Sequence, residues 1–243
     1  MDVIFIIMLM IISIVIVCAA LLTYCDGYDI LNTLNTYIEP RRKKEYHDTN
    51  NLQWARYLRA RWMIIHSEFD LYRSKIPRYR DIDSVQTPVD NDVQHWNVLM
   101  LRLYGKNTIH AKKFPKTMKY INNIKVNIPT VFFSILEPGK TIPPHVGPWN
   151  GILKYHLALD IPIEGEVYLD VNGIKKEWKQ GKDILFDDTF THSAYNISNK
   201  SRVILLLEVE RKLDGFLQSM INKIVLTAAK YNETTNKIVS KVK

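Results

Sequence analysis

The sequence predicts a mainly β protein with flanking helices, whose core is a double-sheet jelly roll or a barrel. From Lys125 onward, short apolar segments alternate with turn residues, including Pro-Gly, Asn-Gly and Asp-Asp pairs. Before that region, residues 51–76 carry apolar side chains at intervals of three and four, which is typical of an amphipathic helix. The 243 residues suffice for one domain with a substantial core and appendages.

An apolar run from Val3 to Leu22 opens the chain, with Ser13 as its only polar interruption. Twenty residues at about 1.5 Å each cross a bilayer core of about 30 Å. A secretory signal has a basic leader and a shorter apolar run, of about 7 to 15 residues. We therefore expect residues 1–24 to form an uncleaved transmembrane anchor, in an intracellular membrane such as the endoplasmic reticulum.

The side of the membrane on which the domain lies stays open. The basic run from Arg41 to Lys44 favours the cytoplasm, because positive residues near a span stay on that side. Three Asn-x-Ser/Thr sequons, at Asn196, Asn199 and Asn232, would matter only in a lumen.

Composition excludes some classes of site. The only cysteines are Cys18 and Cys25, so residues 26–243 need no disulfide framework and hold no thiolate zinc site.

A formal net charge of +8 suits an anionic lipid surface or an acidic substrate as well as nucleic acid. Because the basic residues are scattered and no nucleic-acid motif accompanies them, we expect a solvated surface and no nucleic-acid partner.

The elements are expected in the following order. Residues 25–50 form a stalk or linker with some helix around Ile30 to Tyr37. Residues 51–124 form a helical region packed on the barrel, whose parts are a long helix capped by Asn50 or Asn51, a loop over 77–94, a strand from His95 to Gly105, and a short helix opened by Pro115.

Residues 125–211 form the jelly-roll core, where Asn172-Gly173 predicts a two-residue hairpin turn with positive φ angles. A helix from Leu213 to Tyr231 and a basic tail complete residues 212–243.

Four polar residues of the β region form a candidate site. His145 lies in a Pro-rich turn, His192 follows "FDDTFT", Arg202 opens an apolar strand, and Ser134 lies on an earlier strand. Strand ends gather at one mouth of a jelly roll, so these residues can converge. Two neutral imidazoles bind a divalent first-row metal, and an arginine beside a hydroxyl binds a carboxylate. A non-haem Fe(II) dioxygenase that uses 2-oxoglutarate requires this combination.

Two segments, "FSILEPGKTIPPHVGPWNGILKYHLALDIP" and "WKQGKDILFDDTFTHSAYNISNKSRVILLLEV", closely resemble the aspartyl/asparaginyl β-hydroxylase family. The resemblance covers about Trp96 to Glu210. The family includes hydroxylases of EGF-like domains and bacterial lipid A hydroxylases. It implies a double-stranded β-helix (jelly roll, cupin-like) core that uses Fe(II), 2-oxoglutarate as cosubstrate, and O2.

The resemblance also implies a role for each site residue. His145 and His192 would ligate iron, Ser134 and Arg202 would hold the distal carboxylate of 2-oxoglutarate, and His156 would contact the cosubstrate near the metal.

Two positions stand out against related enzymes. Lys154 stands where vertebrate members carry an arginine that also helps to hold the cosubstrate, and lysine keeps the charge but loses the two-pronged geometry. Most enzymes of this chemistry carry His-x-Asp/Glu, whereas here the residue two after His145 is Gly147. The family resembled here also lacks that carboxylate, which leaves two protein ligands.

Two pairs of residues keep alternative interpretations. Asp187 and Asp188 would act as general acid and base, or would shape a turn while Asp188 orients the site. Trp149 and Asn150 would line the substrate entrance, or Trp149 would cover the rim of the barrel.

By resemblance, the expected function is membrane-anchored, Fe(II)- and 2-oxoglutarate-dependent hydroxylation of the β-carbon of Asp or Asn side chains in a protein or peptide. Membrane contact would come through residues 3–22. One alternative is a lipid acyl-chain hydroxylase of the same family. Another is a non-catalytic jelly-roll interaction module.

Overall fold

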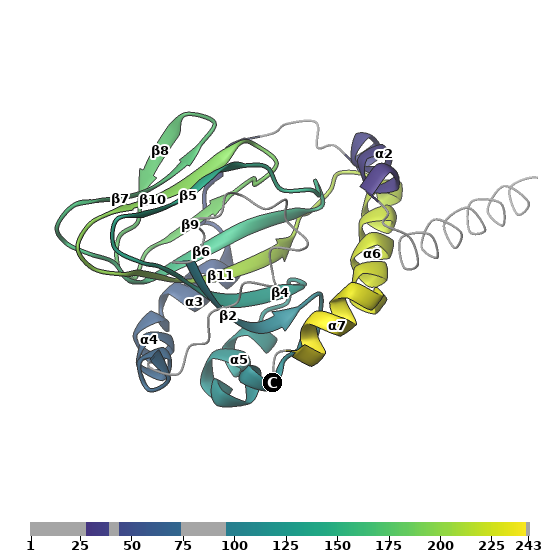
Figure 1. The fold of residues 1–243 in the computed structure, drawn as a ribbon. Helices are drawn as coiled ribbons and strands as arrows, with labels where there is room; N and C mark the ends of the chain where they lie inside the picture. The colour runs from purple at the N-terminus through teal and green to yellow at the C-terminus, as the bar shows by residue number, and fades with distance from the viewer. Residues whose placement is uncertain (1–27, 39–43, 74–95, 242–243) are drawn as a thin grey trace, which may run out of the picture.

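The computed structural model describes residues 28–38, 44–73 and 96–241 (Figure 1). The anchor expected at residues 1–24 and the loop expected at residues 77–94 lie outside these ranges. Along the described part of the chain, no helix has both the length and the apolar character needed to cross a bilayer.

Within the described residues, eleven strands form two antiparallel sheets. The larger sheet has the order β1-β9-β6-β11-β4-β2-β3, and the smaller sheet has the order β5-β10-β7-β8. The strands are β1 (Tyr46–His47), β2 (Trp96–Leu103), β3 (Lys106–Asn107), β4 (Thr130–Leu136), β5 (Lys140–His145), β6 (Ile152–Asp160), β7 (Glu166–Val171), β8 (Ile174–Glu177), β9 (Asp183–Phe186), β10 (His192–Ile197) and β11 (Arg202–Glu210).

The eight strands from β4 to β11 form a jelly roll. Strands β4, β6, β9 and β11 lie in the larger sheet, whereas β5, β7, β8 and β10 form the smaller one, so the chain passes repeatedly between the two. Side chains of both sheets share one apolar cluster, which places the sheets face to face. The predicted mainly β jelly-roll core is confirmed, and β1, β2 and β3 extend its larger sheet (Figure 1).

Side chains of the larger sheet alternate between its two faces, because successive residues of a strand point in opposite directions. On β11, the odd-numbered side chains from Val203 to Val209 join the apolar cluster that contacts the helices. Ile204 and Leu206 of the same strand join the cluster between the sheets. Strands β4 and β6 alternate in the same way. Even-numbered residues of these three strands therefore face the interior of the jelly roll.

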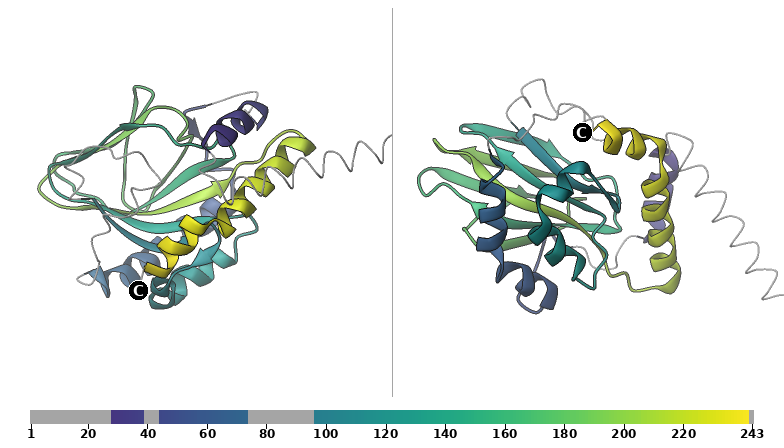
Figure 2. Two further views of the ribbon diagram at one scale, coloured as in Figure 1. Left: turned by 45° about the vertical axis from the view of Figure 1, so that its right-hand side comes forward. Right: turned by 90° about the horizontal axis from the view of Figure 1, so that it is seen from below.

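Helices cover the outer face of the larger sheet (Figure 2). Phe69 and Phe114 both pack against Phe133 of β4, with ring centroids 4.8 Å and 4.9 Å apart. Pro115 opens its helix at the first position, as predicted. The elements on this face are α3 (Gln53–Arg59), α4 (Trp62–Asp70), the 3-10 turn η4 (Ile109–Lys113) and α5 (Pro115–Asn122).

The single long helix predicted from residue 51 is wrong, because the chain breaks it into α3 and α4. The guanidinium of Arg61 donates a hydrogen bond of 2.8 Å to the carbonyl of Tyr57, while the backbone N–H of Arg61 bonds to Leu58. The side chain thereby satisfies the carbonyl that the next helical turn would have used. The predicted asparagine cap is wrong too, since Leu52 precedes α3 without a side-chain cap.

Three helices stand at one edge of the sandwich: α2 (Tyr28–Ile38), α6 (Phe216–Tyr231) and α7 (Glu233–Lys241) (Figure 1). Leu34 and Ile38 of α2 share an apolar cluster with Ile221 and Val225 of α6. The helix expected around Ile30 to Tyr37 is confirmed as α2, which belongs to this cluster, and the region expected to be a stalk also contributes β1 to the larger sheet. The expected basic tail contains α7.

The hairpin turn predicted at Asn172-Gly173 is confirmed. The φ angles of the two residues are 54° and 81°, and the flanking Val171 and Ile174 pair across the turn. The side chain of Asp170 accepts a 2.8 Å hydrogen bond from the backbone N–H of Gly173. Left-handed φ angles at both central residues match the twist of the two strands.

The sequon at Asn196 does not lie at the surface. Its side chain is 0% exposed, and its amide nitrogen donates to the carbonyls of Leu136, Glu137 and Lys200 at 2.8 to 3.0 Å. This amide holds the end of β10 against the turns that flank it, so it is unavailable for glycosylation in the folded protein.

Candidate active site

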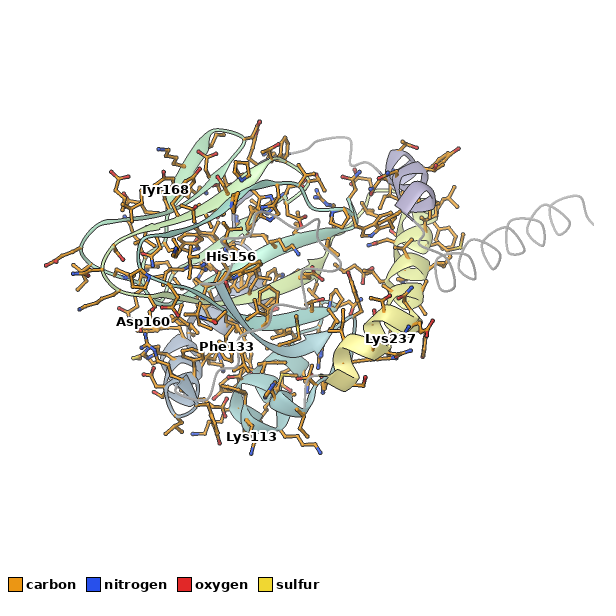
Figure 3. All side chains as sticks on the ribbon, viewed as in Figure 1. Lys113, Phe133, His156, Asp160, Tyr168 and Lys237 are labelled. Carbon is orange, nitrogen blue, oxygen red and sulfur yellow. The ribbon has the colours of Figure 1, made fainter. Side chains whose placement is uncertain are left out.

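A cavity between the two sheets brings together the six residues to which the sequence assigned metal or cosubstrate roles. They come from five strands, and Figure 3 marks the interior position of one of them, His156 on β6. The residues are Ser134, His145, Lys154, His156, His192 and Arg202.

The two histidines proposed as metal ligands are direct neighbours across the smaller sheet. His145 ends β5, His192 begins β10, and their backbones pair in register. Their ring centroids lie 4.1 Å apart. Antiparallel pairing of two strand ends thus brings together side chains separated by 46 intervening residues in the sequence.

Backbone carbonyls orient both imidazoles. Nδ1 of His145 lies 2.8 Å from the carbonyl oxygen of Pro143, and Nδ1 of His192 lies 3.0 Å from that of Phe190. A carbonyl only accepts, so each ring carries its proton on Nδ1 and has a lone pair on Nε2. This tautomer is the one that a metal-binding histidine needs.

Burial keeps both rings neutral. It lowers the pKa of His145, against the opposing effect of the bond to the Pro143 carbonyl. It lowers the pKa of His192 to about 3, with His145 adding to the effect. A neutral ring can donate its lone pair to a cation without first losing a proton.

Among the described residues, no group of three or more His, Cys, Asp or Glu side chains is arranged to hold a metal ion. Gly147, in the position where an acid would follow the first histidine, lies against Asp188: its N–H donates a 2.6 Å hydrogen bond to the Asp188 carbonyl. A Cβ at position 147 would overlap the carboxylate of Asp188. The close approach therefore requires glycine, and the protein contributes two histidines to the candidate centre.

The cationic end of the cavity is built from β11, β4 and β2. Arg202 is 1% exposed, and its guanidinium lies 3.4 Å from the hydroxyl of Ser134. The indole N–H of Trp96 donates to the same hydroxyl at 2.9 Å. The guanidinium also lies 4.9 Å from the ring centroid of Trp178. Burial lowers the pKa of Arg202 to about 9, so the group remains a cation at neutral pH.

Several buried polar atoms of the cavity have no hydrogen-bond partner within the ranges that the structure describes. Among the described residues, nothing accepts from Nε and Nη2 of Arg202, and both ring nitrogens of His156 are unpaired. A buried, unpaired cation is costly unless an anion occupies the site. The arginine, with the Ser134 hydroxyl beside it, fits a carboxylate ligand.

A profile of the Aspartyl/Asparaginyl beta-hydroxylase family matches residues 59–212, which is more than half of the chain. This protein belongs to the aspartyl/asparaginyl beta-hydroxylase family. The family resemblance read from the sequence is thereby confirmed.

Its relatives in this family differ in what their names say they hydroxylate. The "Ornithine lipid ester-linked acyl 2-hydroxylase" of Rhizobium tropici is 31% identical over 172 residues, which cover 69% of this chain and 60% of the relative. The "Aspartyl/asparaginyl beta-hydroxylase" of Mus musculus is 28% identical over 170 residues, covering 67% and 22%. The chain spans less than two thirds of the length of either relative.

In this member of the family, Lys154 does not point a free charge at the cavity. Its ammonium forms an ion pair with Glu208, its direct partner across β6 and β11, and lies 3.5 Å from Asp188. Burial opposes its charge, but the two carboxylates outweigh that effect and raise the pKa of Lys154. Burial also raises the pKa of Asp188 to about 6, although Lys154 opposes the shift.

Of the residues for which the sequence left two roles open, only Asp188 lines the cavity. Asp187 bonds to Thr189 at 2.7 Å and forms a 2.6 Å ion pair with Arg211, outside the cavity, whereas Asp188 lines the cavity. The indole of Trp149 is 4% exposed and donates to Asn222 on α6 at 2.8 Å.

Asn150, the residue after it, is bonded to Asn35 on α2. Trp149 and Asn150 hold the turn after β5 and do not line the cavity.

Sequence reasoning missed Trp96 and Glu208. Glu208 shares the even-numbered face of β11 with Arg202, and its charge interrupts the apolar run "VILLLEV", so the alternation of the strand could have pointed to it. Trp96 reaches Ser134 only through the pairing of β2 with β4. No signal in the sequence specifies that pairing.

Proposed function

We propose that this protein is an Fe(II)- and 2-oxoglutarate-dependent hydroxylase. The observation that supports this most is one cavity with two neutral, carbonyl-oriented imidazoles and a buried guanidinium, two of whose donors have no partner in the described part of the chain. The first group suits a divalent metal, and the second suits a dicarboxylic acid. Family membership supports the same reading.

His145 and His192 would ligate the metal through Nε2. When bound, Fe(II) with 2-oxoglutarate and O2 supplies the oxidising power that hydroxylates a C–H bond, with release of succinate and CO2. The carbonyls of Pro143 and Phe190 hold the rings in the donating tautomer.

Arg202, Ser134 and Trp96 would hold the distal carboxylate of the cosubstrate. The guanidinium would donate to it, while the Trp96 indole fixes the hydroxyl of Ser134 as a further partner. His156, 5% exposed and packed against Phe186 and Trp178, would contact the cosubstrate between this end and the metal. Burial of these groups excludes water and strengthens each electrostatic contact.

Lys154 would keep the metal end of the cavity from becoming strongly anionic. Its ammonium balances Glu208 and Asp188, and the Asp188 carboxylate occupies the space beside Gly147 where other enzymes carry an acid. Asp188 would thus orient groups near the metal from its position two residues after the end of β9. Lys154, held by two carboxylates, would contribute to cosubstrate binding as a point charge.

The proposed acceptor is the β-carbon of an Asp or Asn side chain in a protein or peptide, which the Mus musculus relative's name supports. A lipid acyl chain is the second candidate. Two observations favour it: the relative named for acyl hydroxylation shares 31% identity over 69% of this chain, and the cavity wall is apolar away from the proposed ligand groups. The apolar wall includes Phe132, Ile142, Leu169 and Leu206.

Membrane attachment is part of the proposal. The apolar run at residues 3–22 supports a single-span anchor in an intracellular membrane such as the endoplasmic reticulum. Such an anchor is compatible with either acceptor.

Succinate release from the full chain in mild detergent tests the proposal. We expect Fe(II), 2-oxoglutarate and O2 to yield succinate, and one acceptor to raise the rate and take up ¹⁸O from ¹⁸O2. The acceptors to compare are an Asp- and Asn-containing peptide and ornithine lipid vesicles.

The matched controls are His145→Ala and His192→Ala, which should abolish release. A His192→Ala protein that turns over at the wild-type rate would contradict the proposed ligand. Absence of succinate from the wild type with either acceptor would favour the non-catalytic interaction module.

A further inference from the structure

Three large apolar side chains are exposed on the parts of α2 and α6 that meet. Phe216 is 86% exposed, Tyr37 is 64% exposed and Leu217 is 51% exposed. Gln218, in the first turn of α6, donates a 3.2 Å hydrogen bond to the backbone carbonyl of Tyr37, so the two helices touch at this point. We call these three side chains the α2–α6 corner.

The corner is not needed to hold the helices on the domain. The apolar contacts between α2 and α6 come from other faces, where Leu31 and Leu34 pack with Ile221 against a buried cluster. The exposed side chains of the corner therefore remain available for a partner outside the described residues.

The corner lies at the metal end of the sandwich. His145 ends β5 there, and β11 leaves the same end at Glu210 to enter α6 (Figure 1). Asn35 of α2 donates a 2.7 Å hydrogen bond to the carbonyl of Pro148 and accepts one of 2.9 Å from the N–H of Asn150. The helix that carries Tyr37 is thus tied to the segment that follows the first proposed ligand.

The sequence around α2 indicates what covers the corner. The apolar run ends at Leu22, and α2 begins at Tyr28. Six residue steps reach at most about 20 Å, so an apolar run inside a bilayer keeps α2 beside the lipid surface. The basic sequence from Arg41 to Lys44 follows α2 and complements anionic headgroups.

We propose that the α2–α6 corner inserts into the interface of a lipid bilayer and turns toward the membrane the end of the cavity beside His145 and the exposed Val146, which we call its mouth. A pair of aromatic side chains and a leucine suits the interfacial region, where apolar rings lie at the level of the headgroups. The contact is a second attachment besides the apolar run. It constrains how the domain is oriented on the surface and does not depend on the proposed hydroxylase activity.

Fluorescence quenching by brominated lipids tests the insertion in the full chain reconstituted into anionic vesicles. Replacing the only two cysteines by Cys18→Ala and Cys25→Ser permits single labels at Phe216→Cys or Leu217→Cys. An environment-sensitive dye at either position should be quenched at least threefold more than at a distant exposed site. Two label positions keep the test valid if one variant folds poorly.

The matched control is Ile163→Cys. Ile163 is apolar and 100% exposed, and it lies three residues after Asp160 in the sequence. Asp160 lies on the opposite flank of the molecule from α7 and its labelled Lys237 (Figure 3). A label at Val146→Cys reports the mouth, since Val146 follows His145 and is 57% exposed. It should be quenched more than the label at position 163.

Equal quenching at positions 216, 217 and 163 would overturn the insertion. Equal quenching at positions 146 and 163 would overturn the orientation of the mouth. Self-quenching between labels at position 216 that rises with protein density, without quenching by lipid, would make the corner an interface between two copies of the chain and would also overturn the proposal.

Discussion

Polar side chains reach the cavity because they occupy alternate positions on three neighbouring strands. Ser134 on β4, Lys154 and His156 on β6, and Arg202 and Glu208 on β11 all have even numbers and face the interior. The odd-numbered neighbours pack under the helices. A one-residue slip of any of these strands would exchange the two sets, so the apolar face fixes the position of the chemistry.

Lys154 and Glu208 form a buried pair whose members depend on each other. We expect Lys154→Met to reduce the free energy of unfolding by about 3–5 kcal/mol, because it leaves Glu208 and Asp188 buried without a cation. Urea unfolding of the full chain in mild detergent measures the loss.

The control is the Lys154→Met/Glu208→Met double variant, which removes both charges and should recover part of that stability. If the losses of unfolding free energy caused by Lys154→Met alone and by Glu208→Met alone simply add in the double variant, the two residues do not interact energetically.

His156 makes stability depend on pH. Burial, then the positive charge of Arg202, lowers its pKa well below the usual 6.5. Below about pH 6.5, His156 binds a proton in the unfolded chain but not in the folded chain, so the free energy of unfolding falls as the pH falls. The lowered pKa values of His145 and His192 act in the same direction, whereas the raised pKa of Asp188 opposes them below about pH 6.

We expect His156→Phe to make the metal-free protein less sensitive to acid. Phenylalanine keeps the ring contacts with Trp178 and Phe186 and removes one titrating group. Because a histidine in the unfolded chain titrates near pH 6.5, the fall in unfolding free energy between pH 7.5 and pH 5.5 should be smaller in the variant than in the wild type by about 1.4 kcal/mol in total. Urea unfolding at pH 7.5 and 5.5 measures this fall, and an identical fall in the variant and the wild type would contradict the role assigned to His156.

At the scale of elements, the position of the metal end depends on helices outside the jelly roll. Asn35 on α2 bonds to Pro148 and Asn150, and Asn222 on α6 bonds to the Trp149 indole and, at 2.9 Å, to the carbonyl of Gly151. These contacts hold the segment between the end of β5 and the start of β6. Helices far apart in the sequence thereby support the first proposed ligand.

We expect Asn35→Ala to weaken metal binding several-fold with little loss of fold, because it releases the segment after His145 without touching the ligands. Equilibrium dialysis with Mn²⁺, a redox-stable substitute for Fe(II), measures the affinity.

Asn35→Asp is the conservative control, because it keeps the acceptor for the Asn150 N–H. Its affinity for Mn²⁺ should lie between that of the wild type and that of Asn35→Ala. Equal Mn²⁺ affinity in Asn35→Ala and the wild type would show that the helix is not a positioning element.

The sequence predicted elements best where a local rule decided them. The Asn172-Gly173 turn and the Pro115 helix start follow from backbone preferences of single residues. The break between α3 and α4 escaped prediction because buried Ala55, Leu58 and Ile65 keep one helical period across it. Periodicity reports the buried face and not the continuity of the backbone hydrogen bonds.

At the scale of the whole molecule, the jelly roll and its family were predictable, but the contacts across it were not. Closely spaced strands indicated two sheets, and quoted motifs indicated the proposed ligands. The packing of α2 on α6 depends on residues almost two hundred positions apart, and no local pattern reports such a pairing. No local pattern predicts the hydrogen bond from Trp96 to Ser134 either, which links β2 to the cationic end of the cavity.

Binding of Mn²⁺ and 2-oxoglutarate to the same preparations of the full chain tests the central claim most directly. The wild type should bind one Mn²⁺ per chain and one 2-oxoglutarate. His192→Ala should lose the metal, whereas Arg202→Met should keep it and bind 2-oxoglutarate about 10- to 100-fold more weakly, since a charge-assisted bond is lost. A His192→Ala protein that binds Mn²⁺ as tightly as the wild type would contradict a metal site built on the two paired histidines.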